Sequence, residues 1–502
     1  KKDKSTRRVI SNMSLSYLLA DDHTTMLNII EKILCHFESC FSRKAAFRWF
    51  VIIITGLMLR SDKLGVTSIL RDLALAPGCY DSMLHFFRAS SWSLEDIRKR
   101  WFSAVRLYAP LYKEGNFHVL VGDGVKQSKE GRRMPGVKKL FQESENSAKP
   151  EYMHGHMFGG LGILAGNFRS WACIPLSIRL HDGLQAAREW KGASVSTASH
   201  VVQMVEDSYH AALTFGDSLL LLDRYFLTVP ALEKLRELNN SGKVHMEIVT
   251  KAKKSCTAFQ KPGPRKPGRG RPPKKGDAVH LKGLFASHKE QFMETETELY
   301  GKKKTIRYYS IDLLWGQKLY QELRFVLVEM DGIQSILAST SLALDPLSII
   351  RLYSYRFRIE CTFRELKQQT GAFCYHFWSK HMPKLSYYQK KGEPTPLERV
   401  EDERSRKKIL KTVRAIEVHM ELSCIAMGIL QTLSIRFIGK VCSSQIRYQR
   451  TPSKGRVSEA ALMHYFRKHF FRLLEQKPKS YITQIIHELQ EESEKHWDFL
   501  AS

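Results

Sequence analysis

The sequence lacks the features that mark several large classes of protein. Its nine cysteines are odd in number and scattered, and no two of them form a Cys-x-x-Cys pair. This spacing argues against a zinc site and a disulfide framework, and it favours a reducing cytoplasmic compartment. The longest apolar run, Trp49 to Leu59, is shorter than the roughly 18 residues that a membrane-spanning helix needs. We therefore expect a buried core helix there and no membrane partner.

Acidic side chains are scarce relative to basic ones. The sequence has 51 Asp and Glu residues and 79 Lys and Arg residues, which gives a net charge of +28 and a pI near 9.7. Such an excess predicts a polyanionic partner, with nucleic acid as the first choice and an anionic membrane surface as the second. Hydrophobic residues make up 43% of the 502, so the chain can bury a real core, and its length suggests about three domains.

The first 112 residues have helical spacing. The pattern over Val66 to Leu75 is broken at Ala76-Pro77-Gly78, and Ser93 has the position of an N-cap, with Asp96 three residues later. Two helices joined by a short turn are compatible with a helix-turn-helix, and a plain helical bundle fits equally well.

From Asn116 onward, short apolar runs alternate with helical patterns. The runs of strand length are Phe117 to Val121, His156 to Leu164, Trp171 to Ile178, Leu219 to Leu222 and Val244 to Val249. Helical patterns cover Thr197 to Leu213 and Pro230 to Leu238. This alternation predicts an α/β architecture in which helices cover both faces of a sheet.

Residues 251–276 then form a basic segment rich in Pro and Gly, with ten Lys or Arg residues and no acid. This composition predicts a solvated loop. Its centre, Arg269-Gly270-Arg271-Pro272, resembles an AT-hook, which would suit the minor groove of A·T-rich DNA, and non-specific phosphate neutralisation is an equal alternative. The candidate DNA-contacting residues are Arg265, Lys266, Arg269, Arg271, Lys274 and Lys275.

After this loop, Leu299 to Leu314 and Arg324 to Met330 have the pattern of a β-hairpin, and Pro346 to Gln369 that of one long helix. Asp345 suits the N-cap and Pro346 the first helical position. The remaining chain is mostly helical and basic, and Lys408 to Ile438 is its longest amphipathic stretch.

Two aspartates follow apolar strands directly. Asp123 comes after the first of the runs and Asp223 after the Leu219 to Leu222 run. Ligands of α/β sheets bind beyond the carboxyl ends of strands, so both side chains are placed where a site would be. Taken singly, an aspartate at such a position is more often a turn former or a helix cap.

The predicted helix from Pro346 carries a polar stripe beside its apolar one. Tyr353, Arg356, Glu360 and Lys367 project within an arc of roughly 60° on a continuous helix. Geometry alone favours a solvated face, because Arg356 and Arg364 flank Glu360 at the spacing of common surface ion pairs.

These residues carry a resemblance to a known family. The spacing Tyr353-x2-Arg356-x3-Glu360-x6-Lys367 matches without a gap the Y-x2-R-x3-E-x6-K signature of insertion-sequence-4-type DDE transposases. Asp123 and Asp223 resemble the first two acids of that family's catalytic triad, and Leu222 to Phe226 its aspartate-plus-aromatic motif. The resemblance covers roughly residues 116–377.

The resemblance implies an α/β fold with a ribonuclease-H-like catalytic core and a β-rich insertion, flanked by helical N-terminal and C-terminal regions. We accordingly expect a DNA-binding helical region at 1–112, the core at 113–251 and 335–385, the insertion at 252–334, and a basic helical region at 386–502. The gap of 137 positions between Asp223 and Glu360 holds the insertion.

The implied activity is cut-and-paste DNA transposition. Asp123, Asp223 and Glu360 would be the catalytic metal ligands for two Mg²⁺ or Mn²⁺ ions, since hard cations prefer carboxylate oxygens. Strand nicking would be followed by a hairpin intermediate and strand transfer. Tyr353, Arg356 and Lys367 would contact phosphate, with Arg364 beside them.

The implied partners are double-stranded transposon ends and target DNA, with a homodimer when two ends are paired, in a bacterial cytoplasm at the nucleoid. The alternative is a transposase-derived repressor or architectural protein without catalysis, which has no need of three intact acids. A ribonuclease of the same fold is a third hypothesis, disfavoured by the signature helix and the insertion.

Three smaller signals have plainer interpretations. Trp315 could stack on a flipped base, but a core or interface tryptophan is more common. His154 and His156 could be a ligand pair, but satisfied histidines within a strand are more common. Gly159-Gly160-Leu161-Gly162 is not followed by a phosphate-loop Lys, so close backbone packing explains it better.

Overall fold

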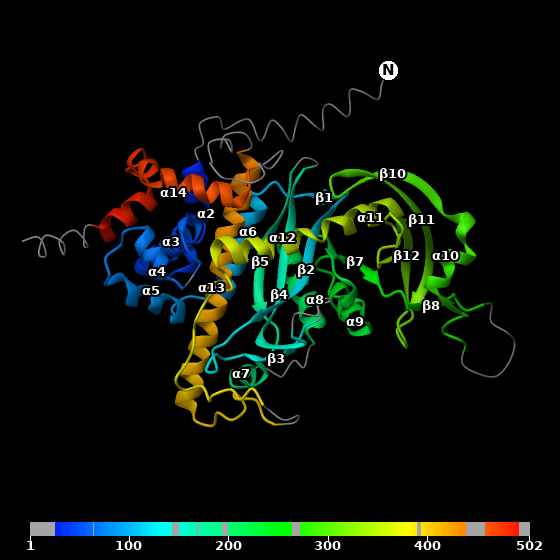
Figure 1. The fold of residues 1–502 in the computed structure, drawn as a ribbon, viewed down its shortest axis with the longest axis horizontal. Coiled ribbons are helices and arrows are strands. Elements are labelled where there is room, and N and C mark those ends of the chain that lie inside the picture. Colours follow the sequence, from blue (N-terminus) through cyan, green and yellow to red (C-terminus); the bar gives the residue numbers. More distant parts are fainter. Residues whose placement is uncertain are drawn as a thin grey trace, which may run out of the picture.

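The computed structural model describes residues 26–63, 65–142, 150–167, 170–192, 199–263, 272–388, 393–437 and 457–490. A large sheet occupies the centre of the molecule (Figure 1). Helices from both ends of the chain pack together on one side of it, and the strands of the insertion curve away on the other. Segments distant in sequence therefore share one helical layer.

The first helices form around apolar side chains. They are α2 (Met26–Cys35), η1 (Glu38–Cys40), α3 (Lys44–Leu59), α4 (Thr67–Asp72), α5 (Cys79–Arg88) and α6 (Leu94–Tyr108). The longest apolar run lies in α3, where every residue from Phe50 to Leu59 is buried, as expected of a core helix. Ser93 caps α6, and its hydroxyl accepts a hydrogen bond from the backbone N–H of Asp96 at 3.2 Å, as predicted.

Five strands form the core of the sheet in the order β5-β4-β2-β6-β7. They are β2 (Phe117–Ser128), β4 (Tyr152–Asn167), β5 (Ser170–Leu180), β6 (Ser218–Leu221) and β7 (Met246–Ala252). Strands β2, β6 and β7 are parallel, and β4 runs antiparallel to its neighbours β2 and β5. This is the ribonuclease-H-like arrangement that the sequence predicts.

Short strands and helices complete this part of the chain. They are β1 (Lys113–Glu114), β3 (Lys138–Phe141), α7 (Gln185–Glu189), α8 (His200–Phe215), η2 (Arg224–Phe226) and α9 (Val229–Asn239). Helix α8 covers one face of the sheet, because a Cβ built on Gly122 of β2 would meet Met204 of α8.

The insertion continues the core sheet instead of forming a separate one. Its elements are β8 (Thr257–Phe259), β9 (Ala278–His280), η3 (Leu281–Gly283), α10 (Leu284–Ser287), η4 (Lys289–Gln291), β10 (Met293–Leu299), β11 (Lys302–Trp315), β12 (Gln321–Met330) and β13 (Ile333–Ser339). Strand β13 pairs antiparallel with β7, with Ser339 opposite Val249, so core and insertion share one 13-stranded sheet. The predicted hairpin is the β11–β12 pair, but Leu299 belongs to β10, which turns into β11 at Tyr300 and Gly301.

Helices from the C-terminal part of the chain close the helical layer, the first two being α13 and α14. Helix α13 (Glu403–Arg436) is long and apolar enough to span a membrane by composition alone, but its most apolar window is entirely buried inside the protein. It packs against α3 and β5, while the Arg414 guanidinium donates to the carbonyls of Ala89 and Trp92 at 2.5 and 2.7 Å. Helix α14 (Glu459–Glu475) packs on α3 and α13.

A candidate active site around Arg356

Asp123 and Asp223 lie at the same level of two neighbouring strands. The expectation that Asp123 ends its strand is wrong, because β2 continues to Ser128 through its pairing with β4. The parallel partner β6 stops at Leu221, opposite Val121. Each aspartate therefore stands two residues beyond the last residue that joins β2 to β6. Since neighbouring strands lie about 4.8 Å apart, the two carboxyl groups start from adjacent backbones.

Glu360 comes from a broken helix, so the predicted single helix over Pro346 to Gln369 is wrong. The structure has α11 (Pro346–Tyr355), α12 (Arg358–Glu365) and a π-helical turn, η5 (Leu366–Thr370). At the break, the N–H groups of Arg356, Ile359 and Glu360 bond to carbonyls three residues back, at 3.1, 3.2 and 3.1 Å. This tightening replaces one α-helical turn by a 3₁₀-like one. The start of α11 is as predicted: Asp345 caps it, accepting from the N–H of Ser348 at 2.9 Å.

Helix α12 lies close to the sheet because β4 is glycine-rich where the helix crosses it. Gly160 pairs with Asp123, so both residues project from the same face. A Cβ on Gly160 would stand 2.5 Å from the ring of Phe363 in α12. Gly159 and Gly162 make similar approaches to His181 and Cys173. Close backbone packing is therefore the right interpretation of this glycine cluster, and at Gly160 it brings α12 down toward Asp123.

The guanidinium of Arg356 joins two of the three acids. Its Nη1 donates to Asp123 Oδ2 at 3.0 Å, and its Nη2 donates to Glu360 Oε1. The Arg356 and Asp123 side chains are 13% and 20% exposed, whereas that of Glu360 is 54% exposed. Burial opposes the charge of Arg356, but the carboxylates of Asp123, Glu360 and Asp223 raise its pKa overall. All three acids therefore act on one buried cation.

Burial governs the protonation of Asp123. It raises the pKa of this carboxyl to about 6, although Arg356 and the N–H of Gly124 pull in the opposite direction. The Gly124 N–H donates to Asp123 Oδ1 at 2.8 Å. The nearby carboxylate of Asp223 raises the pKa further, which is the mark of acids brought close together.

Three further side chains lie within electrostatic range of this site. Burial raises the pKa of Tyr353, and the charges of Arg356, Asp223 and Asp123 also act on it, which places Tyr353 among the acids. Tyr300, from the β10–β11 turn, also feels the charge of Arg356. Burial lowers the pKa of Lys251 in β7, although the charge of Asp223 acts in the opposite direction. Sequence patterns do not assign Tyr300 or Lys251 to the site, because Tyr300 comes from the β10–β11 turn and Lys251 is only one basic residue of the 251–276 segment.

Lys367 and Arg364 make other contacts. Lys367 lies in η5, with its Nζ 5.4 Å from the ring centroid of Phe373, and Arg364 pairs with Glu365 at 3.0 Å. The predicted stripe assumes one continuous α-helix, whereas Lys367 lies in the π-helical turn, so its place on the same face as Tyr353, Arg356 and Glu360 stays a prediction.

Most of the basic loop lies outside the described residues. Arg265, Lys266, Arg269 and Arg271 belong to that part, while Lys274 and Lys275 are described. Lys274 is exposed. Lys275 Nζ lies 3.7 Å from the ring centroid of Phe259, at the base of the loop.

The smaller signals have structural roles. Trp315 Nε1 donates to Cys256 Sγ at 3.2 Å, in a half-buried position within the insertion. Buried His156 contacts Tyr375 Oη at 2.6 Å and the carbonyl of Pro135 at 2.9 Å, while the ring of His154 packs on that of Tyr387. Burial lowers the pKa of His156 to about 3, so this ring is neutral. A histidine satisfied in this way is not a free metal ligand.

The carboxylate donors of the site fit a hard divalent cation, but they do not stand close enough together to coordinate one ion in this arrangement. Carboxylate oxygens are the ligands that such cations prefer. Within the described residues, no three acidic, histidine or cysteine side chains stand close enough together to hold a metal ion. Arg356 provides the positive charge between Asp123 and Glu360 instead.

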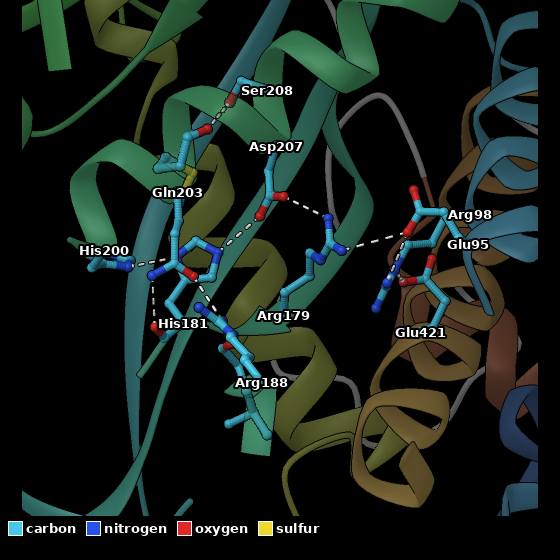
Figure 2. Close-up of polar contacts among 12 residues, drawn as sticks. Glu95, Arg98, Arg179, His181, Arg188, His200, Gln203, Asp207, Ser208 and Glu421 are labelled. Carbon is cyan, nitrogen blue, oxygen red and sulfur yellow. Dashed lines mark hydrogen bonds and ion pairs between the residues drawn. The ribbon is translucent and has the colours of Figure 1, made fainter. Parts of the chain in front are cut away.

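A chain of polar contacts runs beneath the same sheet (Figure 2). His200 Nδ1 contacts His181 Nδ1 at 2.7 Å, and His181 Nε2 contacts Asp207 at 2.9 Å. Asp207 forms an ion pair with Arg179 at 2.6 Å, and Arg179 forms a second ion pair with Glu95 at 3.5 Å. A Cβ on Gly124 would stand 2.8 Å from His200 Nε2, so this row of polar contacts begins directly under β2, the strand that carries Asp123.

The far end of this chain reaches the helical layer. Glu95 pairs with Arg98 at 3.3 Å, and Arg98 pairs with fully buried Glu421 of α13 at 2.9 Å. These contacts therefore connect α8, which lies beneath β2, to α6 and α13. The sequence did not indicate this connection, because its members are single residues spread over more than 300 positions.

Comparison with known proteins places this site in a family. A family model described as DDE superfamily endonuclease matches residues 36–308, just over half of the chain. The match includes Asp123 and Asp223, and Glu360 lies beyond its end. No curated protein matches the sequence. With its ribonuclease-H-like sheet and with Asp123 and Asp223 on neighbouring strands, the chain belongs to the DDE superfamily of endonucleases, enzymes that act on DNA and generally use divalent metal ions.

Proposed function

We propose that this endonuclease is a cut-and-paste transposase of the insertion-sequence-4 type. The observation that carries the proposal is the Arg356 guanidinium, which bonds to both Asp123 and Glu360, with Asp223 and Tyr353 within range of its charge. A nuclease needs the acids alone, whereas the tyrosine and arginine beside them are what the Y-R-E-K signature adds. The hairpin route and the insertion-sequence type are parts of this proposal.

Asp123, Asp223 and Glu360 would hold two Mg²⁺ or Mn²⁺ ions. Cations bound there would activate a nucleophilic oxygen and stabilise the leaving oxygen of the phosphodiester. Arg356 must leave Asp123 for this to happen, since it forms a 3.0 Å contact with the carboxylate. Its released guanidinium can then bind a DNA phosphate through two parallel hydrogen bonds. Arg356 would thus exchange an internal partner for a substrate partner.

The surrounding side chains have supporting roles in the proposal. The Tyr353 hydroxyl stays protonated because burial raises its pKa, so it can donate to a phosphate oxygen. Lys251 adds positive charge beside Asp223. Lys367 and Arg364 would approach the strand farther along, and the 265–275 residues would contact the flanking duplex. The helices before residue 112 would bind the transposon end, and pairing of two ends would require a homodimer in the bacterial cytoplasm.

The test is cleavage of duplex DNA that carries the end of the element, incubated with Mg²⁺ or Mn²⁺. We expect nicks and then hairpin ends from the wild-type protein. Asp123→Ala, Asp223→Ala and Glu360→Ala should each abolish cleavage while duplex affinity survives, because that affinity comes mainly from Lys and Arg contacts to phosphate.

Glu237→Ala is a matched control that should cleave like wild type, since Glu237 is an exposed acid of α9 that pairs with Lys234 at 2.9 Å and not with Arg356. Near-normal nicking by one triad variant would remove that residue from the site. Binding without any nicking by the wild-type protein would instead support a transposase-derived repressor.

A further inference from the structure

A basic surface separate from the 265–275 loop lies on the segment that follows η5. Residues 375 to 380 are irregular in backbone but strictly alternating in exposure. Tyr375, Phe377 and Ser379 are buried, whereas His376, Trp378 and Lys380 are exposed. An alternation of this kind is typical of a strand in a sheet, but this segment pairs with no strand in the described structure. It therefore presents an imidazole, an indole and an ammonium group in a row to solvent.

The buried side of this segment is firmly anchored. The Phe377 ring packs 5.5 Å from that of Phe87 in α5. Lys129 Nζ donates to the carbonyls of Phe373 and Tyr375 at 2.6 and 3.1 Å. The N–H of Ser379 donates to the carbonyl of Arg133 at 3.1 Å. The exposed row is therefore held on a fixed support, as a binding surface requires.

Two clefts adjoin the row, and both are lined by Trp378 and His376. One, of about 480 Å³, lies between α5 and α13, which pack side by side in Figure 1. The other, of about 640 Å³, lies against residues 128–134. Trp378 is 57% exposed, which is unusual for an indole with no partner protein.

The charge of these clefts is almost entirely of one sign. Their described lining contains seven Lys or Arg residues and one acid, Glu130. The basic residues are Arg88, Lys129, Arg132, Arg133, Lys380, Lys384 and Lys408. A polyanion is therefore the ligand that the surface favours.

We propose that this surface binds single-stranded DNA, with a base stacked on Trp378 and the adjoining phosphates in the two basic clefts. Intact duplex hides the faces of its bases, so an exposed indole gains little from it. An unpaired strand offers both a face for stacking and phosphates for the cations. An enzyme that cuts one strand of a duplex produces such a strand, but the surface itself uses none of the candidate catalytic acids.

The experiment compares the affinity of wild-type protein and Trp378→Ala for a labelled oligothymidylate and for a labelled blunt-ended duplex made of two complementary strands. Stacking of one base contributes about 1–3 kcal/mol, so we expect Trp378→Ala to lose about tenfold or more in affinity for the single strand. Affinity for duplex should stay within about twofold of wild type. Trp378→Phe should recover most of the loss, because its ring still stacks.

Phe471→Ala is the matched control, because Phe471 is also an exposed aromatic beside Lys468 and Arg472, on α14. It should bind like wild type. Replacing Lys380 and Lys408 together by Gln should flatten the salt dependence of single-strand binding, by about 0.7 in log–log slope for each lost contact.

Unchanged single-strand affinity in Trp378→Ala would overturn the proposal, as would an equal loss on duplex. Glu360→Gln separates this inference from the proposed catalysis. It should bind the single strand normally even where nicking fails.

Discussion

The proposed metal site predicts that Arg356 competes with the metal ions for Asp123, and replacing Arg356 by Ala tests this prediction directly. In the wild-type protein, a cation can bind Asp123 fully only after the Nη1–Oδ2 contact of 3.0 Å is broken. We therefore expect Arg356→Ala to bind Mn²⁺ more tightly than wild type. The same variant should nick DNA more slowly, because it lacks the group that would hold the phosphate.

The size of the effect follows from the burial of the two contacts. A hydrogen bond between charged groups contributes about 1.5–3 kcal/mol when it is shielded from water. The contact to Glu360 adds little, because the Glu360 side chain is 54% exposed. The loss of competition is then about 2 kcal/mol, and since about 1.4 kcal/mol corresponds to tenfold in affinity, we expect Mn²⁺ to bind some 10- to 50-fold more tightly.

The measurement is a titration in which electron paramagnetic resonance reports free Mn²⁺. Arg364→Ala is the control, since it also removes a guanidinium near Glu360 but one that pairs with Glu365. It should leave the affinity unchanged. Equal or weaker Mn²⁺ binding by Arg356→Ala would show that Arg356 does not compete for the acids, and the exchange of partners proposed for it would then be wrong.

Three further predictions concern DNA binding, packing and stability. Neutralising the six basic residues of the 265–275 loop should weaken duplex binding and reduce its log–log salt slope by about 0.9 per lost contact, and an unchanged slope would show that the loop does not touch DNA. Gly160→Ala should lower both nicking and thermal stability, because its Cβ would stand 2.5 Å from the ring of Phe363, whereas Gly263→Ala, with open space around it, should do neither. Arg98→Met should destabilise the protein to urea by about 3–5 kcal/mol, because it leaves buried Glu421 without its partner. Burial raises the pKa of Glu421 from 4.5 to about 7 even beside Arg98. Between these two pH values the folded state holds a proton that the unfolded state releases, so the free energy of unfolding falls as the pH rises from 4.5 to about 7. The damage in Arg98→Met should therefore be greater at pH 8 than at pH 5, and equal damage at both would contradict the assigned role of the pair.

Local signals in the sequence predicted most of the elements but not how they end. Asp345 and Ser93 cap their helices as expected, because an N-cap depends only on residues within one turn. The end of β2 was misjudged because the strand continues through Gly122 and Gly124 by pairing with β4, some 35 positions farther on. Pairing across such a distance leaves no trace in the local pattern.

The helix that carries Glu360 shows the same limit at a finer scale. Neither Gly nor Pro occurs at its break, so periodicity predicted a continuous helix. The break coincides with Arg356, whose side chain bonds to Asp123 across the sheet and to Glu360. Residue spacing thus predicts the acids and the signature, but the position of Arg356 between Asp123 and Glu360 depends on contacts that only the folded chain makes.

The pairing of β13 with β7 has a consequence for any attempt to trim the enzyme to a minimal core. Strand β7 is covered on one edge by β6 and on the other only by the last strand of the insertion. Excising residues 253–339 would uncover a row of backbone N–H and C=O groups along a strand rich in Ile, Val and Thr. Such an edge is a template for pairing with another chain. The shortened protein should therefore self-associate or precipitate, and the insertion would protect the solubility of the central sheet in addition to any contact that it makes with DNA.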